Sequence, residues 1–182
     1  MKNLANRLSY STIFLTLALL TVSGQIIAKG LPRPVPEFTH SRSEAWLNSK
    51  PLTQVMLRGK VVLIDFWTFD CWNCYRSFPW LVDLEERFQD RDFQVVGVHT
   101  PEFEHERQVS QLVEKVERYR LRHPIMVDND FSYWNALGSS YWPSFFVIDK
   151  KGMIRANYIG ETTSGSDQAN RIERLLESLL ME

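Results

Sequence analysis

Two cysteines separated by two residues, Cys71 and Cys74, are the side chains best suited to chemistry, and the sequence contains no other cysteine. The pair follows the apolar run Val61–Trp67 and precedes apolar residues at helical spacing, which places it between a buried strand and an amphipathic helix. A disulfide between them closes too short a loop to constrain the unfolded chain much. This context indicates thiol–disulfide exchange rather than a structural disulfide.

The positions of the two cysteines predict different roles. Cys71 stands at the first turn of the expected helix, where unpaired backbone N–H groups and the helix dipole favour a thiolate. In Cys-x-x-Cys pairs the pKa of the first cysteine can fall to roughly 3.5–7.5, so we predict that Cys71 is the nucleophile. Cys74, one turn deeper, is then the resolving thiol that attacks the mixed disulfide and releases reduced substrate. The spacing also allows the reverse reaction, in which a substrate is oxidised.

Asp65 is the second candidate for chemistry, because it interrupts the apolar run of the strand. Burial of a carboxylate is costly unless the group is paired or protonated, so the pKa of Asp65 should rise. We predict that Asp65 lies behind Cys74 and accepts or donates the proton of that thiol. The alternative is a carboxylate that finds hydrogen bonds at the edge of the strand.

Trp142 and Pro143 stand immediately before a predicted strand, where a proline is tolerated because it has no N–H to donate. The local sequence alone favours a trans bond between them, since cis bonds are the minority even before proline. Trp72 lies between the two cysteines and is expected to be exposed to solvent. These three residues therefore become candidates for the surface around the cysteines.

The four histidines are interpreted as structural or surface residues. His99 follows a predicted strand and could line the site, because function gathers at the carboxyl ends of strands in such sheets. A loop histidine satisfied by local hydrogen bonds is nevertheless the favoured interpretation of His99. His40, His105 and His123 are expected at the surface.

Strands and helices alternate along the sequence and must position these residues. Apolar runs predict strands at 61–67, 93–98, 124–127, 144–149 and 153–158. Helical spacing predicts helices at 41–47, after the cysteines with a kink at Pro79, at 104–121, at 132–137 and from a cap at Asp167 onward. Alternation implies parallel strands, and the late hairpin adds antiparallel ones. We therefore predict an α/β fold with a central mixed β-sheet flanked by helices on both faces.

Length, charge and the N-terminal segment indicate the class and the compartment. The 182 residues, 44% of them hydrophobic, suit one domain, and a net charge of -1 gives no sign of a nucleic-acid partner. Lys2 and Arg7 precede a short apolar run at 13–22, which is typical of a signal peptide or, alternatively, of an uncleaved signal anchor. We expect a periplasmic or secreted protein, or one anchored to the inner membrane. The expected parts are an export segment at 1–28, a Pro-rich linker at 29–40 and the domain at 41–182.

Several separated motifs resemble the thioredoxin superfamily. They are the run from Val61 to Cys74 and the run from Trp142 to Gly152. More narrowly, the chain resembles the periplasmic TlpA/ResA-like redoxins, and the runs at 66–74, 97–103 and 128–135 are similar to the thioredoxin-like domain of DipZ-type proteins. The resemblance covers about residues 37–182.

The resemblance implies a thioredoxin fold with a redox-active disulfide, Cys71–Cys74, and no other cofactor. By position, Asp65 matches the buried acid of the superfamily. Pro143 matches the cis-proline that faces the disulfide, which reverses the expectation of a trans bond. The backbone of Trp142 would then be free to pair with a substrate peptide. Between the cysteines, Trp72 and Asn73 stand in place of the two residues that are usual in the superfamily. Because these two residues tune the redox potential, the direction of electron flow stays open.

Together these features predict an extracytoplasmic thiol–disulfide oxidoreductase, with reduction as the favoured direction. Its partners would be protein thiols and disulfides, such as those of cytochrome c maturation or other periplasmic redox proteins, with a separate membrane protein as electron donor. Two alternatives remain. A copper chaperone could hold Cu(I) with both thiolates and His99, although such chaperones usually space their cysteines by three residues. A thiol peroxidase is the other, because Thr68-x-x-Cys71 matches part of the peroxiredoxin signature.

Overall fold

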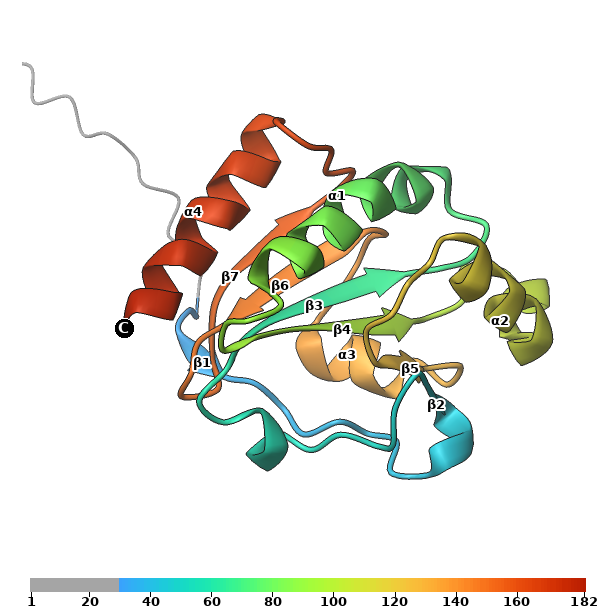
Figure 1. Ribbon diagram of the computed structural model, residues 1–182. Coiled ribbons are helices and arrows are strands. Elements are labelled where there is room, and N and C mark those ends of the chain that lie inside the picture. The colour runs from blue at the N-terminus through green and yellow to red at the C-terminus, as the bar shows by residue number, and fades with distance from the viewer. Residues whose placement is uncertain (1–29) are drawn as a thin grey trace, which may run out of the picture.

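The computed structural model describes residues 30–182, so the predicted export segment at 1–28 lies outside the described residues. One seven-stranded sheet forms the centre (Figure 1). Its strands are β1 (Arg33–Pro34), β2 (Trp46–Leu47), β3 (Val61–Trp67), β4 (Phe93–His99), β5 (Ile125–Val127), β6 (Ser144–Ile148) and β7 (Met153–Ile159). The helices are α1 (Trp72–Phe88), α2 (Val109–Arg118), α3 (Ser132–Leu137) and α4 (Asp167–Met181). Three short 3-10 helices lie at Ser43–Ala45, Val55–Leu57 and Glu104–Arg107.

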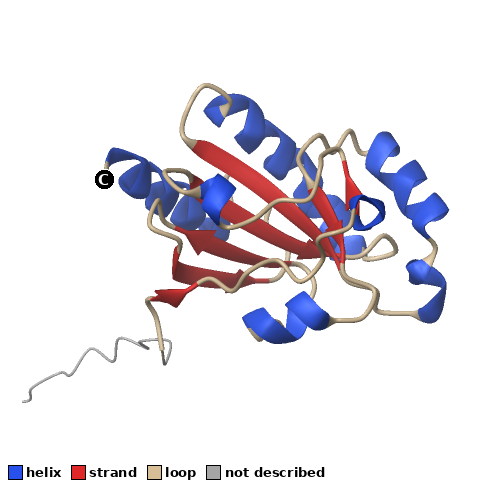
Figure 2. Cartoon of the chain, turned by 90° about the horizontal axis from the view of Figure 1, so that it is seen from below, coloured by secondary structure: helices blue, strands red, loops and turns tan. Residues whose placement is uncertain are grey.

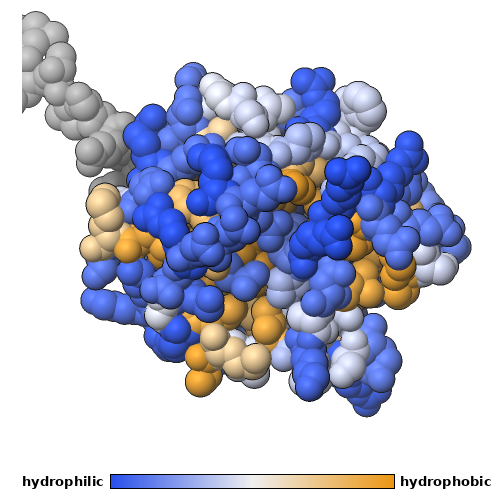
Figure 3. Space-filling view, in the orientation of Figure 1, coloured by the Kyte–Doolittle hydropathy of each residue, from blue (hydrophilic) through white to orange (hydrophobic). Residues whose placement is uncertain are grey.

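The sheet is mixed, which confirms the predicted fold class, and its order is β1-β7-β6-β3-β4-β5-β2. Strands β3, β4 and β5 run parallel, whereas β6 pairs antiparallel with both β3 and β7. Helices α1 and α4 share one apolar core with the sheet, and α3 packs in another core on the opposite face (Figure 2). Figure 3 shows that the outer surface of the face with α1 and α4 is mostly hydrophilic. In residues 30–182 no helix has both the length and the apolar character needed to cross a bilayer.

Strand β3 is buried along its whole length because β4 and β6 flank it and helices cover both of its faces. Its side chains alternate between the two faces, as in any strand. Ile64 and Phe66 pack in the core with α3. Leu63 packs with α1 and α4, and Trp67 packs with apolar residues of α1 and α2. Asp65 lies between these last two on the strand, so its side chain faces α1.

Helix α1 starts at the N-cap residue Cys71, directly after the loop that leaves β3. Its apolar side chains recur at three- and four-residue intervals and are buried, as the spacing predicted: Cys74, Phe78, Leu81, Leu84 and Phe88. Trp80, also on this helix, donates from Nε1 to Glu173 Oε1 of α4 at 2.8 Å. The helix therefore holds its first turn, with both cysteines, against the end of β3.

The segment 29–40, predicted to be a Pro-rich linker, contributes a short strand to the sheet in its described part. Arg33–Pro34 forms strand β1 and pairs with the first residues of β7, at the end of the sheet opposite the start of α1 (Figure 1). A proline fits there because an edge strand loses no ladder bond to its missing N–H. Leu31, Val35 and Phe38 pack against the core on the α3 side.

Three helix boundaries also differ from the predictions. The segment 41–47 forms a 3-10 helix followed by strand β2, and no side chain caps it. The segment 104–121 divides into a 3-10 helix and α2, because the backbone between them is extended. The last helix is capped by Ser166, whose hydroxyl accepts a backbone N–H of the first turn at 3.1 Å, and Asp167 is its first residue. Each difference involves a helix end, where short-range signals compete.

Candidate active site

The two cysteines form a disulfide at the N-terminus of α1, with their Cα atoms 5.2 Å apart. Cys71 is partly exposed, whereas Cys74 is fully buried. The backbone N–H of Cys74 donates to Cys71 Sγ at 3.2 Å. After reduction, this N–H and the helix dipole would stabilise negative charge on that sulfur. Cys71 is therefore accessible to a substrate, whereas Cys74 is shielded by the surrounding protein.

Aromatic residues contribute to the buried cluster that contains Cys74 and to the exposed surface of the protein. Trp72 is 69% exposed, as expected, and Tyr141 is 60% exposed. Trp142 stacks on Trp134 with ring centroids 4.2 Å apart and packs, like Cys71, against the buried cluster that contains Cys74. Trp142 and the two cysteines therefore share one cluster, and the substrate-binding role predicted for Trp72, Trp142 and Pro143 stays a prediction.

The bond between Trp142 and Pro143 is cis. The expectation of a trans bond from local sequence is wrong, and the conformation implied by the resemblance is the one observed. The bond immediately precedes β6, whose first residue, Ser144, pairs with Phe66 of the central strand β3. Local sequence could not distinguish the two isomers, because Trp142 packs on residues of other segments and these contacts are known only from the fold.

Asp65 is buried, with 1% of its surface exposed, and its Oδ1 has no hydrogen-bond partner among the described residues. Burial, with a smaller contribution from the negative charge of Glu85, raises the pKa of Asp65 to about 8. The alternative of a carboxylate satisfied at the strand edge does not fit, because β3 lies in the middle of the sheet. A group with such a pKa can exchange a proton near neutral pH.

His99 is the last residue of β4 and is completely buried. Its ring stacks on Phe69 at 5.5 Å, and its Nε2 lies 3.4 Å from Thr68 Oγ1. Burial lowers the pKa of His99 to about 3, so the ring is neutral at physiological pH. The predicted loop histidine is therefore a buried support for the loop that leads into the cysteines.

Glu106 lies in the segment for which the sequence predicted only a helix, and nothing in that segment marked it as a functional residue. Its carboxylate is buried and accepts three backbone N–H groups, from Asp70 at 3.1 Å, Glu102 at 2.6 Å and Phe103 at 2.7 Å. It thereby ties the loop after β4 to the residue before Cys71. No local pattern distinguishes it from its acidic neighbours.

His123, predicted at the surface, is instead buried between α1 and β4. Its Nδ1 lies 2.8 Å from Glu85 Oε2 of α1. Its ring occupies the space beside Gly97, the residue of β4 that pairs with Asp65. The ring thus lies close to the buried acid.

Gly97→Ala is expected to destabilise the protein by about 1–3 kcal/mol, the usual cost of overpacking a core. An added Cβ would stand 3.1 Å from both His123 Nε2 and Ile125 Cγ1, and the histidine ring is held in place by Glu85. Guanidinium denaturation of the oxidised protein measures the change. An unchanged midpoint would show that the ring moves aside at no cost.

One group in the described part of the chain has the side chains and spacing of a metal site: His40, Asp128 and Asp130. His40 Nε2 lies 3.1 Å from Asp130 Oδ1. Asp128, however, already accepts backbone N–H groups of Tyr133 and Trp134 at 2.9 Å. Its carboxylate therefore anchors the first turn of α3, which accounts for its burial without a cation.

A disulfide at a helix N-terminus, a buried acid on the central strand that leads to it and this sheet topology together define the class of thioredoxin-like thiol–disulfide oxidoreductases. Residues 32–157 match the model of the AhpC/TSA family. The chain belongs to that family. A solution structure of a thioredoxin-like protein in the oxidised form superposes with a TM-score of 0.71 at 29% identity, covering 84% of this chain and 97% of that one.

Curated relatives point to the same class. The thiol-disulfide oxidoreductase YkuV of Bacillus subtilis is 31% identical over 125 residues, which are 69% of this chain and 82% of that protein. Protein DipZ of Mycobacterium bovis is 38% identical over 119 residues, 64% of this chain. The protein SUPPRESSOR OF QUENCHING 1 of Arabidopsis thaliana is 41% identical over 128 residues, 70% of this chain. The matched segments are only 17% of DipZ and 12% of the Arabidopsis protein.

Proposed function

We propose that the protein is an extracytoplasmic thiol–disulfide oxidoreductase that reduces disulfides of protein substrates. The observation that carries this proposal is the asymmetry of the disulfide, with Cys71 accessible at the helix N-terminus and Cys74 fully buried. A substrate can reach only the first sulfur, so the second is reserved for the intramolecular step. The exposed rings of Trp72, the neighbour of Cys71, and of Tyr141, the neighbour of Trp142, offer a surface for a protein substrate rather than a small molecule.

The reaction proceeds in two exchanges. The Cys71 thiolate attacks a substrate disulfide, a Cys71–substrate bond forms, and the other substrate sulfur leaves as a thiolate. Cys74 then gives its proton to the Asp65 carboxylate and attacks Cys71 Sγ, which releases the second substrate thiolate and forms the Cys71–Cys74 disulfide. Two electrons pass to the substrate, and an external dithiol must return them before the next cycle. No other cofactor takes part.

The compartment and partners of this proposal rest on the N-terminal sequence. Lys2 and Arg7 followed by the apolar run at 13–22 support export, with the segment either removed or kept as an anchor. Outside the cytoplasm, reduction requires electrons from a membrane donor. The substrates would be thiol proteins such as those of cytochrome c maturation. A midpoint potential near about -270 mV supports the reducing direction, whereas one near about -120 mV supports oxidation.

Trapping of mixed disulfides tests the exchange mechanism. With Cys74→Ala, the second exchange cannot occur, so substrate proteins are expected to accumulate on Cys71 in cells and to be released by dithiothreitol. Cys71→Ala is the matched control and should trap none. If both variants give the same bound proteins, or neither gives any, the proposed exchange is wrong.

Two other functions remain to be tested on the same protein. A copper chaperone would bind Cu(I) through the reduced cysteines, with His99 as the third ligand, and metal analysis of anaerobically reduced protein would reveal it. A thiol peroxidase would consume peroxide as fast as it reduces disulfides. The hydroxyl of Thr68, from the peroxiredoxin-like motif, lies near the ring of His99, which favours a structural role for it.

A further inference from the structure

We infer that His123 and Glu85 form a proton relay that connects the buried Asp65 carboxyl group with solvent on the side of α1 away from the disulfide. This inference rests on the proposed function, because it concerns the proton that Cys74 releases during the second exchange. It gives a role to a buried histidine and to a glutamate that the exchange itself does not use. Both act through Asp65 and are positioning residues.

The first argument is the position of the histidine ring. Gly97 pairs in register with Asp65 in the parallel ladder of β3 and β4, so a side chain on Gly97 would project to the same face as that of Asp65. Gly97 has none, and an ideal Cβ there would stand 3.1 Å from His123 Nε2. The imidazole therefore fills the space directly beside the buried acid.

The second argument is a complementary pair of unsatisfied atoms. Asp65 Oδ1 and His123 Nε2 both lack a hydrogen-bond partner among residues 30–182, although both are buried. Buried polar atoms are rarely left unpaired. Since the register of the strands directs both atoms to the same space, a water molecule between them would satisfy both.

The third argument is the tautomer of the ring. Glu85 Oε2 lies 2.8 Å from His123 Nδ1, so a carboxylate there accepts the Nδ1 proton and leaves Nε2 as an acceptor. An acceptor suits the protonated form of Asp65, which burial favours. The backbone of His123 is also held in place, because the side chain of Asn48 donates from Nδ2 to the His123 carbonyl at 2.9 Å.

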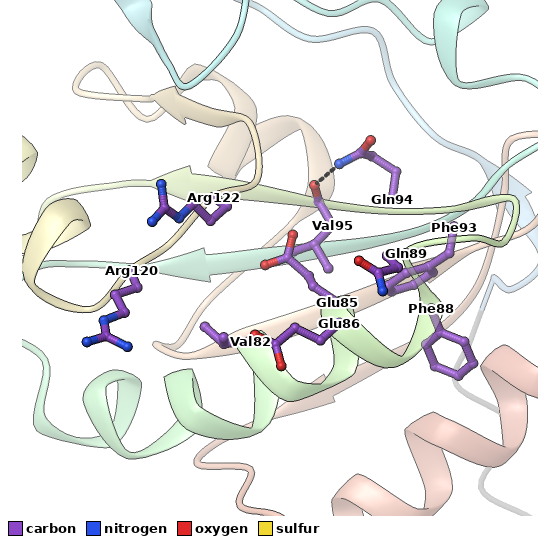
Figure 4. A pocket seen from close by; sticks show the side chains of 10 residues that line it. All are labelled: Val82, Glu85, Glu86, Phe88, Gln89, Phe93, Gln94, Val95, Arg120 and Arg122. Atoms are coloured by element: carbon purple, nitrogen blue, oxygen red, sulfur yellow. Dashed lines mark hydrogen bonds between the residues drawn. The ribbon is translucent and has the colours of Figure 1, made fainter.

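The fourth argument is the exit to solvent. The Glu85 side chain remains 22% exposed, whereas that of His123 has no exposure. Glu85 lines a surface groove together with Glu86, Arg120 and Arg122, and Figure 4 shows its carboxylate pointing from α1 toward β4. At its other end, the proposed proton path starts from Cys74 in the first turn of α1. The facing residues of β4 and β6, Gly97 and Phe145, carry no titratable group.

The proton balance is simple. Asp65, which is protonated at neutral pH, first passes its proton to Nε2 of His123, the ring gives its Nδ1 proton to Glu85, and Glu85 releases that proton to water in the groove. The Asp65 carboxylate then takes the proton of Cys74 as that sulfur attacks Cys71. Each group returns to its starting charge, although the ring must exchange its tautomer before the next cycle.

Single-turnover kinetics with 5,5′-dithiobis(2-nitrobenzoate) test the relay. Attack by Cys71 releases one thionitrobenzoate, and attack by Cys74 on the mixed disulfide releases a second, so the two steps are observed separately. With His123→Gln or Glu85→Gln, the second release is expected to slow about a hundredfold at pH 7, the lower end for general acid–base catalysis, while the first is unchanged. Glu86→Gln, in the same groove but without a contact to His123, is the matched control and should behave as the native protein.

A second measurement does not depend on exchange activity. In the reduced protein, carbon-13 NMR follows the titration of the Asp65 carboxyl group, whose midpoint is expected to fall in both Glu85→Gln and His123→Gln but not in Glu86→Gln. If the rates, their pH profile and this titration are the same in all variants, the relay is wrong. If the native protein shows no second release, the proposed exchange is wrong instead. The titration of Asp65 then still shows whether His123 and Glu85 are coupled to this carboxyl group.

Discussion

Asp65→Asn is expected to make the oxidised protein more stable than the native one at alkaline pH. The folded state holds the proton of Asp65 up to a pKa of about 8, whereas the ordinary pKa of an aspartate is 3.8, so the unfolded chain loses the proton first. Native stability therefore falls as the pH rises from about 4 through 8, because ionisation favours the unfolded state. The asparagine variant lacks this loss, and its advantage should grow by on the order of 4 kcal/mol between about pH 5 and 9.

Urea denaturation across this pH range measures the effect, and the oxidised form avoids titration of the cysteines. Asp83→Asn on α1 is the matched control, since Asp83 is exposed and pairs with Arg87 at the surface. Its effect should stay below about 1 kcal/mol at every pH. Parallel stability curves for Asp65→Asn and the native protein would mean that Asp65 is already ionised at neutral pH in the folded state.

Cys71→Ser is expected to reduce disulfide exchange to the rate seen without the protein. Serine occupies the same N-cap and can accept the same backbone N–H, so the helix should form, but a hydroxyl is not a nucleophile toward disulfides at neutral pH. Reduction of insulin by dithiothreitol provides the assay. The loss should be complete because Cys74 is fully buried and cannot replace the missing thiol.

Cys74→Ser separates the two steps. This variant should still form a mixed disulfide through Cys71 with a first-step rate near that of the reduced native protein, yet should not turn over. If Cys71→Ser retained turnover, Cys74 would have to be reachable by substrate, and the assignment of nucleophile and resolving thiol would be reversed.

The sequence identified those parts of the site that lie within one continuous segment. The strand, the cysteine pair and the following helix occupy 61–88, and their roles follow from spacing within a few residues. Asp65 was identifiable because it interrupts an apolar run, and its burial is as expected, whereas its predicted place behind Cys74 stays a prediction. The exposure of Trp72 followed from its place between the cysteines. The catalytic roles of these residues remain predictions.

Interactions between distant segments were not predictable in this way. His123 contacts Glu85 across 38 positions, and Glu106 binds the N–H of Asp70 across 36. A histidine or glutamate in a polar segment looks like a surface residue until the fold supplies its partner. Gly97 gave the only local signal, since a glycine inside a strand indicates a close approach by another group.

The pairing of β1 with the start of β7 also determines how the domain can be tethered. The chain enters at the end of the sheet farthest from α1's first turn, and β1 is fixed there by two residues of backbone pairing. Any attachment made through residues upstream of Gly30 would hold the domain at this end of the sheet, opposite the end at which Cys71 caps α1. In such an arrangement the disulfide and the point of attachment would stand at opposite ends of the domain.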